Sequence, residues 1–135
     1  MVPSGPDGVY VVYIDRRAAS ETPDAGQPKN FLRPCLLLLL KESPAHGYEL
    51  LERLREFDID KDPGGLYRTL RAMEHEALVA SNWEPSFTGP DRRRYQVTPA
   101  GEVWLDAWTR ALEDTRHILD RYLARHARAT APARG

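Results

Sequence analysis

The sequence has little cysteine and no long apolar run. Its one cysteine, Cys35, excludes an intrachain disulfide framework, and the leucines beside it favour a buried thiol over a reactive one. The Leu36–Leu40 run has five residues, far fewer than the roughly 20 that cross a bilayer. The N-terminus also lacks the basic stretch followed by an apolar one that marks a secretory signal. We therefore expect a cytoplasmic protein with no membrane partner.

Net charge is nearly absent as well. The chain has 19 Lys and Arg residues against 20 Asp and Glu residues, for a formal charge of −1. This balance excludes a uniformly basic polymer binder, but it allows a nucleic-acid binder whose basic side chains are gathered on one face. With 41% apolar and 29% charged residues in 135, the composition fits one globular domain rather than a disordered chain.

Catalytic motifs are missing too. The chain has no nucleophile elbow, phosphate-binding loop or dinucleotide-binding glycine pattern, so we predict neither an enzyme nor a cofactor. Asp114 and His117 lie three residues apart and would supply half of a metal site between two helices, whereas His126 lies off that face. Without a cysteine cluster we predict no bound metal, and a metal-sensing repressor stays open as an alternative.

What the sequence does have is a series of proline-marked helix starts. Pro34 and Pro63 fit first helical turns, while Ser43-Pro44 and Thr98-Pro99 each look like a cap followed by proline. Apolar spacing then predicts helices over 31–42, 43–57, 63–77 and 99–128, and strands over 79–83 and 93–97 joined by a loop over 84–92. The remaining segments are an extension over 1–30, mobile or holding one strand at Val9–Ile14, and a tail over 129–135.

This order of elements predicts a mainly α fold with a small β-hairpin. Three helices and a hairpin describe a winged helix-turn-helix over residues 31–98, and the long helix over 99–128 would serve for dimerisation. In a winged helix-turn-helix the third helix enters the major groove of DNA. Residues 31–98 are therefore the predicted DNA-binding domain.

The third helix has an apolar face and a basic one. The apolar sector, predicted to face the core, comprises Leu66, Leu70, Met73 and Ala77. The opposite side carries Lys61, Gly64, Arg68, Arg71 and His75, with Tyr67 on its flank. Gly64 and Gly65 would let the backbone approach a phosphate at the helix N-terminus. The two arginines are long enough to reach base edges or phosphates.

The predicted hairpin adds a second basic element. Its second strand begins with Arg92, Arg93 and Arg94. Alternation sends Arg93 and Tyr95 to one face and places Arg92, Arg94 and Gln96 on the other. All six basic residues of the 61–98 segment lie on the predicted DNA face. A basic wing beside a basic helix would hold DNA at two points, and the alternative is a protein-interaction module that keeps the fold without binding DNA.

Four stretches, in the expected order, resemble the PadR family of bacterial transcriptional regulators. They are His46–Leu50, Gly65–Arg71, Met73-Glu74 and Arg94–Gly101, and Asn30–Leu36 is also similar to a branch of polyhydroxybutyrate-responsive repressors. The resemblance implies a winged helix-turn-helix with C-terminal dimerising helices, acting mostly as a repressor on inverted-repeat, double-stranded operator DNA. One departure is Ala77, where the family usually has glycine. A left-handed helix cap there would cost alanine about 1 kcal/mol.

The C-terminal helix carries a heptad pattern that predicts a homodimer. The pattern comprises Leu105, Trp108, Leu112, Thr115, Leu119 and Tyr122. The first helix is apolar on all sides, so we expect it to be covered by a second subunit. The predicted dimer interface comprises Leu36, Leu37, Leu40, Leu105, Leu112, Leu119 and Tyr122. A two-fold dimer would place two recognition helices roughly 34 Å apart.

A small-molecule effector site is the last prediction. Trp104 and Trp108 lie one turn apart on the long helix, where they would form interface core or hold a planar, aromatic effector that releases the repressor. His46 begins the second helix, where a histidine makes local hydrogen bonds, and the resemblance adds it to this candidate site.

Overall fold

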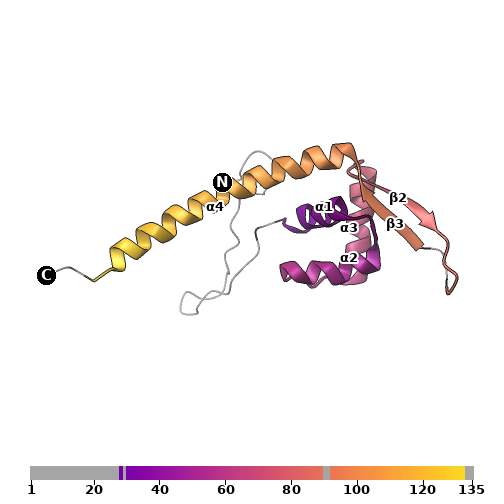
Figure 1. The fold of residues 1–135 in the computed structure, drawn as a ribbon, viewed down its shortest axis with the longest axis horizontal. Helices are drawn as coiled ribbons and strands as arrows, with labels where there is room; N and C mark the ends of the chain where they lie inside the picture. Colours follow the sequence, from indigo (N-terminus) through magenta and orange to yellow (C-terminus); the bar gives the residue numbers. More distant parts are fainter. Residues whose placement is uncertain (1–27, 29, 90–91, 133–135) are drawn as a thin grey trace. The chain divides into compact units, whose positions relative to one another are not determined.

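The computed structural model describes residue 28 and residues 30–89 and 92–132, which form helices and a small sheet (Figure 1). The strand predicted at Val9–Ile14 lies outside these residues. In chain order the described elements are α1 (Leu32–Glu42), β1 (Ala45–His46), α2 (Gly47–Arg53), the 3-10 helix η1 (Leu54–Phe57), α3 (Pro63–His75), β2 (Val79–Glu84), β3 (Arg92–Val97) and α4 (Pro99–Thr130). The chain divides into two compact units, with the boundary between Ala107 and Trp108 inside α4. The unit over Asn30–Ala107 has the predicted winged helix-turn-helix fold, and it also contains the start of α4, Pro99–Ala107.

The sheet has three antiparallel strands in the order β1-β3-β2. β2 and β3 pair over their whole length, from Val79 opposite Val97 to Glu84 opposite Arg92, and form the wing. On the other edge of β3, Ala45 pairs with Tyr95 and His46 with Arg94. The sequence did not predict β1, because two residues are too few to show an alternating pattern.

This short strand also corrects the predicted start of the second helix. Ser43-Pro44 is not its cap; α2 begins at Gly47 and His46 is the N-cap. The backbone N–H of His46 donates to the Glu49 side chain at 2.8 Å, completing a capping box. Because Ala45 and His46 pair with β3, they form a strand, and α2 begins only after them at Gly47. η1 then ends at Phe57, and its C-cap Asp58 has a left-handed backbone.

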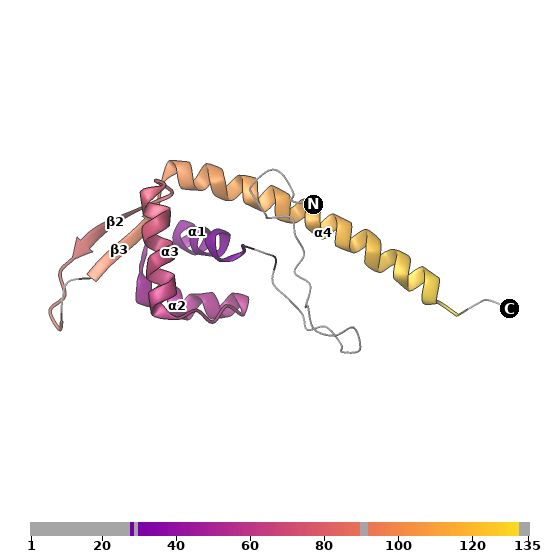
Figure 2. The ribbon, with the colours of Figure 1, turned by 180° about the vertical axis from the view of Figure 1, so that it is seen from behind.

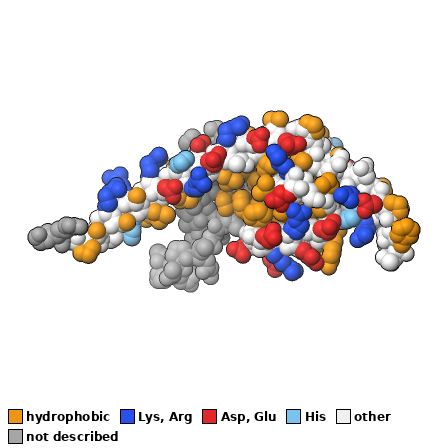
Figure 3. Space-filling model, in the orientation of Figure 1, with side chains coloured by type: hydrophobic (Ala, Val, Ile, Leu, Met, Phe, Trp, Pro, Cys, Tyr) orange, Lys and Arg blue, Asp and Glu red, His pale blue; other side chains and the backbone are white. Residues whose placement is uncertain are grey.

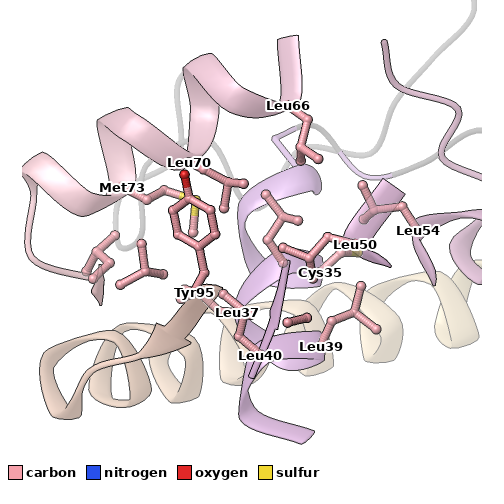
Figure 4. Packing of buried hydrophobic residues seen from close by; sticks show 14 of the residues in the cluster. Cys35, Leu37, Leu39, Leu40, Leu50, Leu54, Leu66, Leu70, Met73 and Tyr95 are labelled. Carbon is pink, nitrogen blue, oxygen red and sulfur yellow. The ribbon is translucent and has the colours of Figure 1, made fainter. Parts of the chain in front are cut away.

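The hydrophobic core is built from α1, α2, α3 and the sheet. Figure 4 shows Leu66, Leu70 and Met73 extending from α3 toward Tyr95 and the leucines of α1 and α2. α2 and α3 pack against each other in both ribbon views, as Figure 2 shows from behind. Cys35 is buried in this core, as its leucine neighbours indicated, and burial raises the pKa of its thiol to about 12.

The core also overturns part of the predicted dimer interface. Leu36, Leu37 and Leu40 are almost completely buried in the same cluster, and so is Leu105 at the start of α4. The prediction that a second subunit covers these four residues is wrong, because the sheet and the other helices of the same chain already do so. Leu38 is the exposed member of the Leu36–Leu40 run.

Helix α3 has a defined cap at each end. At its start, the Asp62 carboxylate accepts a hydrogen bond from the Gly65 N–H at 2.8 Å, and Pro63 occupies the first turn. At its end, Leu78 N–H donates to Met73 C=O and Ala77 N–H to Glu74 C=O, both at 2.9 Å, which is a Schellman motif. Ala77 is left-handed, with φ of 63°, and exposed. The expectation that Ala77 faces the core is therefore wrong.

Thr98 joins the end of α3 to the start of α4. Its hydroxyl lies 2.6 Å from the Ala77 carbonyl oxygen, to which it donates, and it accepts from Gly101 N–H at 2.9 Å. Gly101 is buried against the Leu78 carbonyl oxygen, where a side chain would collide. α4 then continues to Thr130, two residues beyond the predicted end. Among the described helices, none combines the length and the hydropathy that a membrane span needs.

Candidate nucleic-acid interface

Helix α3 divides its side chains as its sequence pattern predicts. Leu66, Leu70 and Met73 are completely buried, whereas Gly64, Arg68, Arg71 and His75 are exposed. Lys61 lies half-buried just before the helix, and Tyr67 is half-buried on its flank, packed against the core. Within the described residues, Arg68 and Arg71 make no ion pair. The helix therefore presents two exposed guanidinium groups on one side, neither of them in an ion pair with a described residue.

The two glycines at the start of α3 do not play the same part. Gly65 is buried, its N–H is taken by Asp62, and an added Cβ would lie 2.8 Å from an Asp62 oxygen and from Lys61 Cε. It is not open to a phosphate, so that part of the prediction is not supported. Gly64 is exposed, with no neighbour closer than 3.4 Å to an added Cβ.

Asp62 also changes the electrostatics expected at this helix start. The hydrogen bond from the Gly65 backbone N–H holds the pKa of Asp62 below its ordinary value, with Arg68 and Lys61 adding to the effect. The carboxylate remains ionised and already occupies the positive end of the helix. An incoming phosphate would therefore meet the arginine side chains further along α3 rather than the helix terminus.

The wing alternates as predicted. Tyr95 is buried and Arg93 half-buried on one face of β3, while Arg92, Arg94 and Gln96 are exposed on the other. The three consecutive arginines nevertheless differ in their contacts, which the sequence did not show.

Arg93 and Arg94 are both paired with acidic side chains. Arg93 lies over the Trp83 ring, with Nη1 3.5 Å from a Glu74 oxygen. Arg94 Nη1 lies 3.2 Å from a Glu84 oxygen. Arg92 makes no ion pair with any residue that the structure describes, so it is the wing arginine whose charge is least compensated. One face of the molecule, seen in Figure 3, shows the same mixing of positive and negative side chains on a larger scale.

His46 links the start of α2 to the wing. Its Nδ1 lies 2.9 Å from Glu49 Oε1 and its Nε2 lies 3.1 Å from Glu84 Oε1. The pKa of Glu49 is held low mainly by the His46 backbone N–H, and that of Glu84 mainly by Arg94 and then by His46. The expected local hydrogen bonds of His46 are present, and the contact with Glu84 adds a long-range one.

A pocket of about 460 Å³ opens between α3, the wing and the start of α2. It is lined by His46, Tyr48, Tyr67, Arg71, Trp83, Arg92, Arg93 and Tyr95. Tyr48, Trp83 and Tyr95 were not predicted as site residues. The signal that could have found Trp83 is alternation along the wing, because Trp83 pairs with Arg93 on the face that also carries Tyr95, whereas the sequence has no such signal for Tyr48.

The three residues predicted for an effector site, His46, Trp104 and Trp108, do not line one pocket in the structure. His46 lines this pocket, whereas Trp104 and Trp108 are absent from its described lining. Trp104 packs partly buried against the domain core, and Trp108 is buried. Elsewhere on α4, Leu112 is half-buried and Thr115 buried, whereas Asp114 and His117 are exposed. No group of three metal-ligating side chains occurs within the residues that the structure describes.

Comparison with known proteins gives a consistent result. Residues 36–107 match the Transcriptional regulator PadR-like family. Transcriptional regulator Rv3488 of Mycobacterium tuberculosis (strain ATCC 25618 / H37Rv) is 36% identical over 79 residues, which cover 58% of this chain and 73% of that protein.

Two solved structures illustrate the shared fold. The crystal structure of the PadR-like transcriptional regulator BC4206 from Bacillus cereus superposes with a TM-score of 0.62 at 26% identity, over 70% of this chain and 93% of the other. Bacillus subtilis PadR in complex with operator DNA superposes with a TM-score of 0.56 at 20% identity, over 62% of this chain and 48% of the other.

Proposed function

Because the chain belongs to the PadR-like family of transcriptional regulators, we propose that it binds double-stranded operator DNA with α3 in the major groove and the β2–β3 wing beside it. Members of this family are regulators and not enzymes. The DNA-bound structure of Bacillus subtilis PadR supports operator binding as the activity to test in this chain. A regulator of this kind would act in the cytoplasm.

The observation that carries the proposal is that Arg68 and Arg71 are exposed on the same side of α3 and make no ion pair with a described residue. Arginine forms bidentate hydrogen bonds with guanine edges and with phosphates, so two such side chains on the recognition helix are suited to both. Arg92 would extend the contact along the wing, with Arg93 and Arg94 contributing less because their charges are shared with Glu74 and Glu84. The other proposed contacts are Lys61, Gly64, Tyr67 and His75.

A selected operator fragment tests this directly. Fluorescence anisotropy of the labelled fragment should show Arg68→Gln and Arg71→Gln weakening binding by about tenfold or more each, the cost of one lost bidentate contact. The control is Lys41→Gln, which removes one exposed charge from the end of α1 and should leave affinity within about twofold. A protein-interaction module would bind no fragment at all, and wild-type protein that selects no DNA would contradict the proposal.

We further propose that the protein is a homodimer that represses from an inverted repeat. Helix α4 supports this, because Ile118, Leu119, Tyr122 and Leu123 are all exposed large apolar residues on it. Residues 99–128 would then serve for dimerisation, with Leu112, Leu119 and Tyr122 in the interface and the 31–98 segment holding the DNA. A two-fold axis would place the two α3 helices roughly one turn of duplex apart, and bound protein would block transcription from that site.

The sequence also suggested that an aromatic effector binds near Trp104 and Trp108. This stays a prediction, and it is separable from DNA binding because neither tryptophan lies on α3 or the wing. A Trp108→Ala variant that binds aromatic compounds as the wild type does would contradict it.

A further inference from the structure

The imidazole of His46 lies between two carboxylates that come from different elements. Its Nδ1 is 2.9 Å from Glu49 Oε1 on α2, and its Nε2 is 3.1 Å from Glu84 Oε1 at the end of β2. Only 13% of the His46 side chain is exposed, so the ring is held mainly by protein groups rather than by water. Through its two nitrogens, the ring therefore connects the start of α2 to the wing.

This geometry requires one particular protonation state of the ring. An ionised carboxylate only accepts hydrogen bonds, and a neutral imidazole has a single N–H to donate. Both ring nitrogens donate at once only when the imidazole is doubly protonated and positively charged. The observed arrangement is therefore that of the cation, because a neutral ring would turn a bare nitrogen toward one of the two carboxylates.

Both carboxylates are ionised over the pH range in which a histidine usually changes its charge. The His46 backbone N–H is the main reason why the pKa of Glu49 lies below its ordinary value. The pKa of Glu84 is lowered mainly by Arg94 and then by His46. Histidine usually changes its charge between about pH 5 and pH 8. In that range the ring, and not either carboxylate, decides whether both hydrogen bonds are present.

Loss of the ring proton would not affect the two contacts equally. Glu49 Oε1 also accepts a hydrogen bond from the His46 backbone N–H at 2.8 Å, so this carboxylate stays beside the ring in either state. Glu84 has another partner, because Arg94 Nη1 donates to its second oxygen at 3.2 Å. A neutral ring therefore keeps its proton on Nδ1 for Glu49 and loses the bond to Glu84, which is the bond between α2 and the wing.

The other charged side chains near the ring are positive. His46 shares its pocket with three arginines and three tyrosines: Arg71 and Tyr67 of α3, Arg92, Arg93 and Tyr95 of β3, and Tyr48 of α2. The arginines disfavour the cationic ring, whereas the two carboxylates, which are in direct contact with it, favour the cation. The protonated ring is therefore stabilised from the carboxylate side only.

We propose that the His46–Glu84 contact is a proton-dependent link between α2 and the wing, present while the imidazole carries both protons and absent once it has lost one. A rise in pH breaks the link by removing the ring proton, and a fall below the carboxylate range breaks it by protonating Glu84. The consequence for DNA rests on the proposed function. A wing released from α2 has to be ordered again on the duplex, so operator affinity should fall as the ring loses its proton.

Nuclear magnetic resonance of the full-length, ¹⁵N-labelled protein without DNA tests the link. The ring nitrogen shifts of His46, assigned with His46→Gln, follow the loss of its proton. Two probes on β2, the Glu84 backbone N–H and the Trp83 indole N–H, should shift with the same midpoint as the ring. Probes that stay unchanged while the ring titrates would overturn the link.

Glu84→Gln separates a broken hydrogen bond from a change of charge alone. An amide both donates and accepts, so it can bond the ring in either protonation state. The Trp83 indole N–H of this variant should therefore lose most of its pH response. Glu56→Gln, which removes an exposed carboxylate on η1, should keep the response of the wild type. If Glu84→Gln also kept the full response, the shift would report only the ring charge and the proposal would be wrong.

Anisotropy of the labelled operator at constant ionic strength then measures the effect on DNA binding. From about pH 5 to pH 8, the affinity of the wild type should fall by about fivefold more than that of Glu84→Gln, the effect of one lost hydrogen bond. Both proteins lose the same ring charge, so the comparison cancels its direct attraction for phosphate. Parallel pH profiles would overturn the control of DNA binding. A link seen in a protein that selects no operator would overturn the proposed function and leave the link standing.

Discussion

The guanidinium of Arg93 lies 4.6 Å from the centre of the Trp83 ring. The two residues are paired on neighbouring strands, Trp83 on β2 and Arg93 on β3. The pair stiffens the hairpin by a cation–π contact between its two strands, beside the hydrogen bond that Arg93 donates to the Ser81 hydroxyl at 3.3 Å. Because the ring also lines the pocket, this contact holds one wall of the pocket in place.

Replacing Trp83 should therefore weaken the wing. We expect Trp83→Leu to lower the free energy of unfolding by about 0.5–1 kcal/mol, the usual strength of an exposed cation–π contact. Urea denaturation followed by far-ultraviolet circular dichroism measures this. Phe87→Leu is the matched control, because Phe87 is completely exposed and should change stability by less than about 0.5 kcal/mol. Equal effects of the two substitutions would contradict a specific contact.

The left-handed Ala77 offers a stabilising substitution. Ala77→Gly should raise the free energy of unfolding by about 1 kcal/mol, because glycine adopts the φ of 63° without steric cost. The same replacement at Ala72, inside α3, should lower it by about 1 kcal/mol. Relative to the wild type, the urea midpoint should rise for Ala77→Gly and fall for Ala72→Gly. If both midpoints moved in the same direction, a strained cap at Ala77 would be excluded.

The carboxylates around His46 predict acid sensitivity. The folded-state pKa values of Glu49 and Glu84 lie below the ordinary 4.5, so their interactions stabilise the fold above that pH. Their contribution is lost as the pH falls through 4.5 toward the lower folded-state values. Urea midpoints measured from pH 6 downward should decline over that range, and Glu49→Gln should flatten the decline. Glu113→Gln, an exposed change on α4, should leave it unaltered.

Charge placed on α4 should separate the proposed dimer. Leu119→Glu combined with Tyr122→Glu puts two carboxylates into an exposed apolar stretch, where pairing would bury them at high cost. Sedimentation velocity should show a monomer, and far-ultraviolet circular dichroism should show the helix content of the wild type. Arg125→Gln, further along the same helix, should remain dimeric. A double variant that still sediments as the wild type does would place the interface elsewhere.

Operator binding should fall steeply as salt rises, because each contacted phosphate releases counterions. We expect Arg71→Gln to reduce the slope of log affinity against log salt concentration by about one. The Lys41→Gln variant should keep the wild-type slope. Anisotropy titrations at several salt concentrations measure both slopes, and parallel lines for Arg71→Gln and wild type would remove Arg71 from the phosphate contacts.

Helices and strands could be predicted from the sequence where apolar and polar residues alternate regularly over the whole element. The buried positions of α3 and the alternation in β3 follow from spacing alone, so the exposed arginines were predicted as well. The strand Ala45–His46 was not, because pairing with a distant strand and not local pattern makes it a strand. The prediction that a second subunit covers the α1 leucines was wrong for a related reason. The sequence does not show how many helices and strands of the same chain pack against one helix.

The difference among Arg92, Arg93 and Arg94 was equally hidden. Three identical neighbours have the same local pattern, and only the fold brings Glu74 and Glu84 to two of them. Likewise Trp83 and Tyr48 stand on separate elements, and the pocket that they share with α3 exists only in three dimensions.

The bonds around Thr98 make the start of α4 a rigid joint. Since this hydroxyl bonds the Ala77 carbonyl and caps the Gly101 N–H, the last turn of α3 and the first turn of α4 must move together. A rotation of α3 on DNA would therefore turn the first residues of α4 with it. In the proposed dimer, the start of α4 is then the place where the pairing of two chains would influence the orientation of each recognition helix.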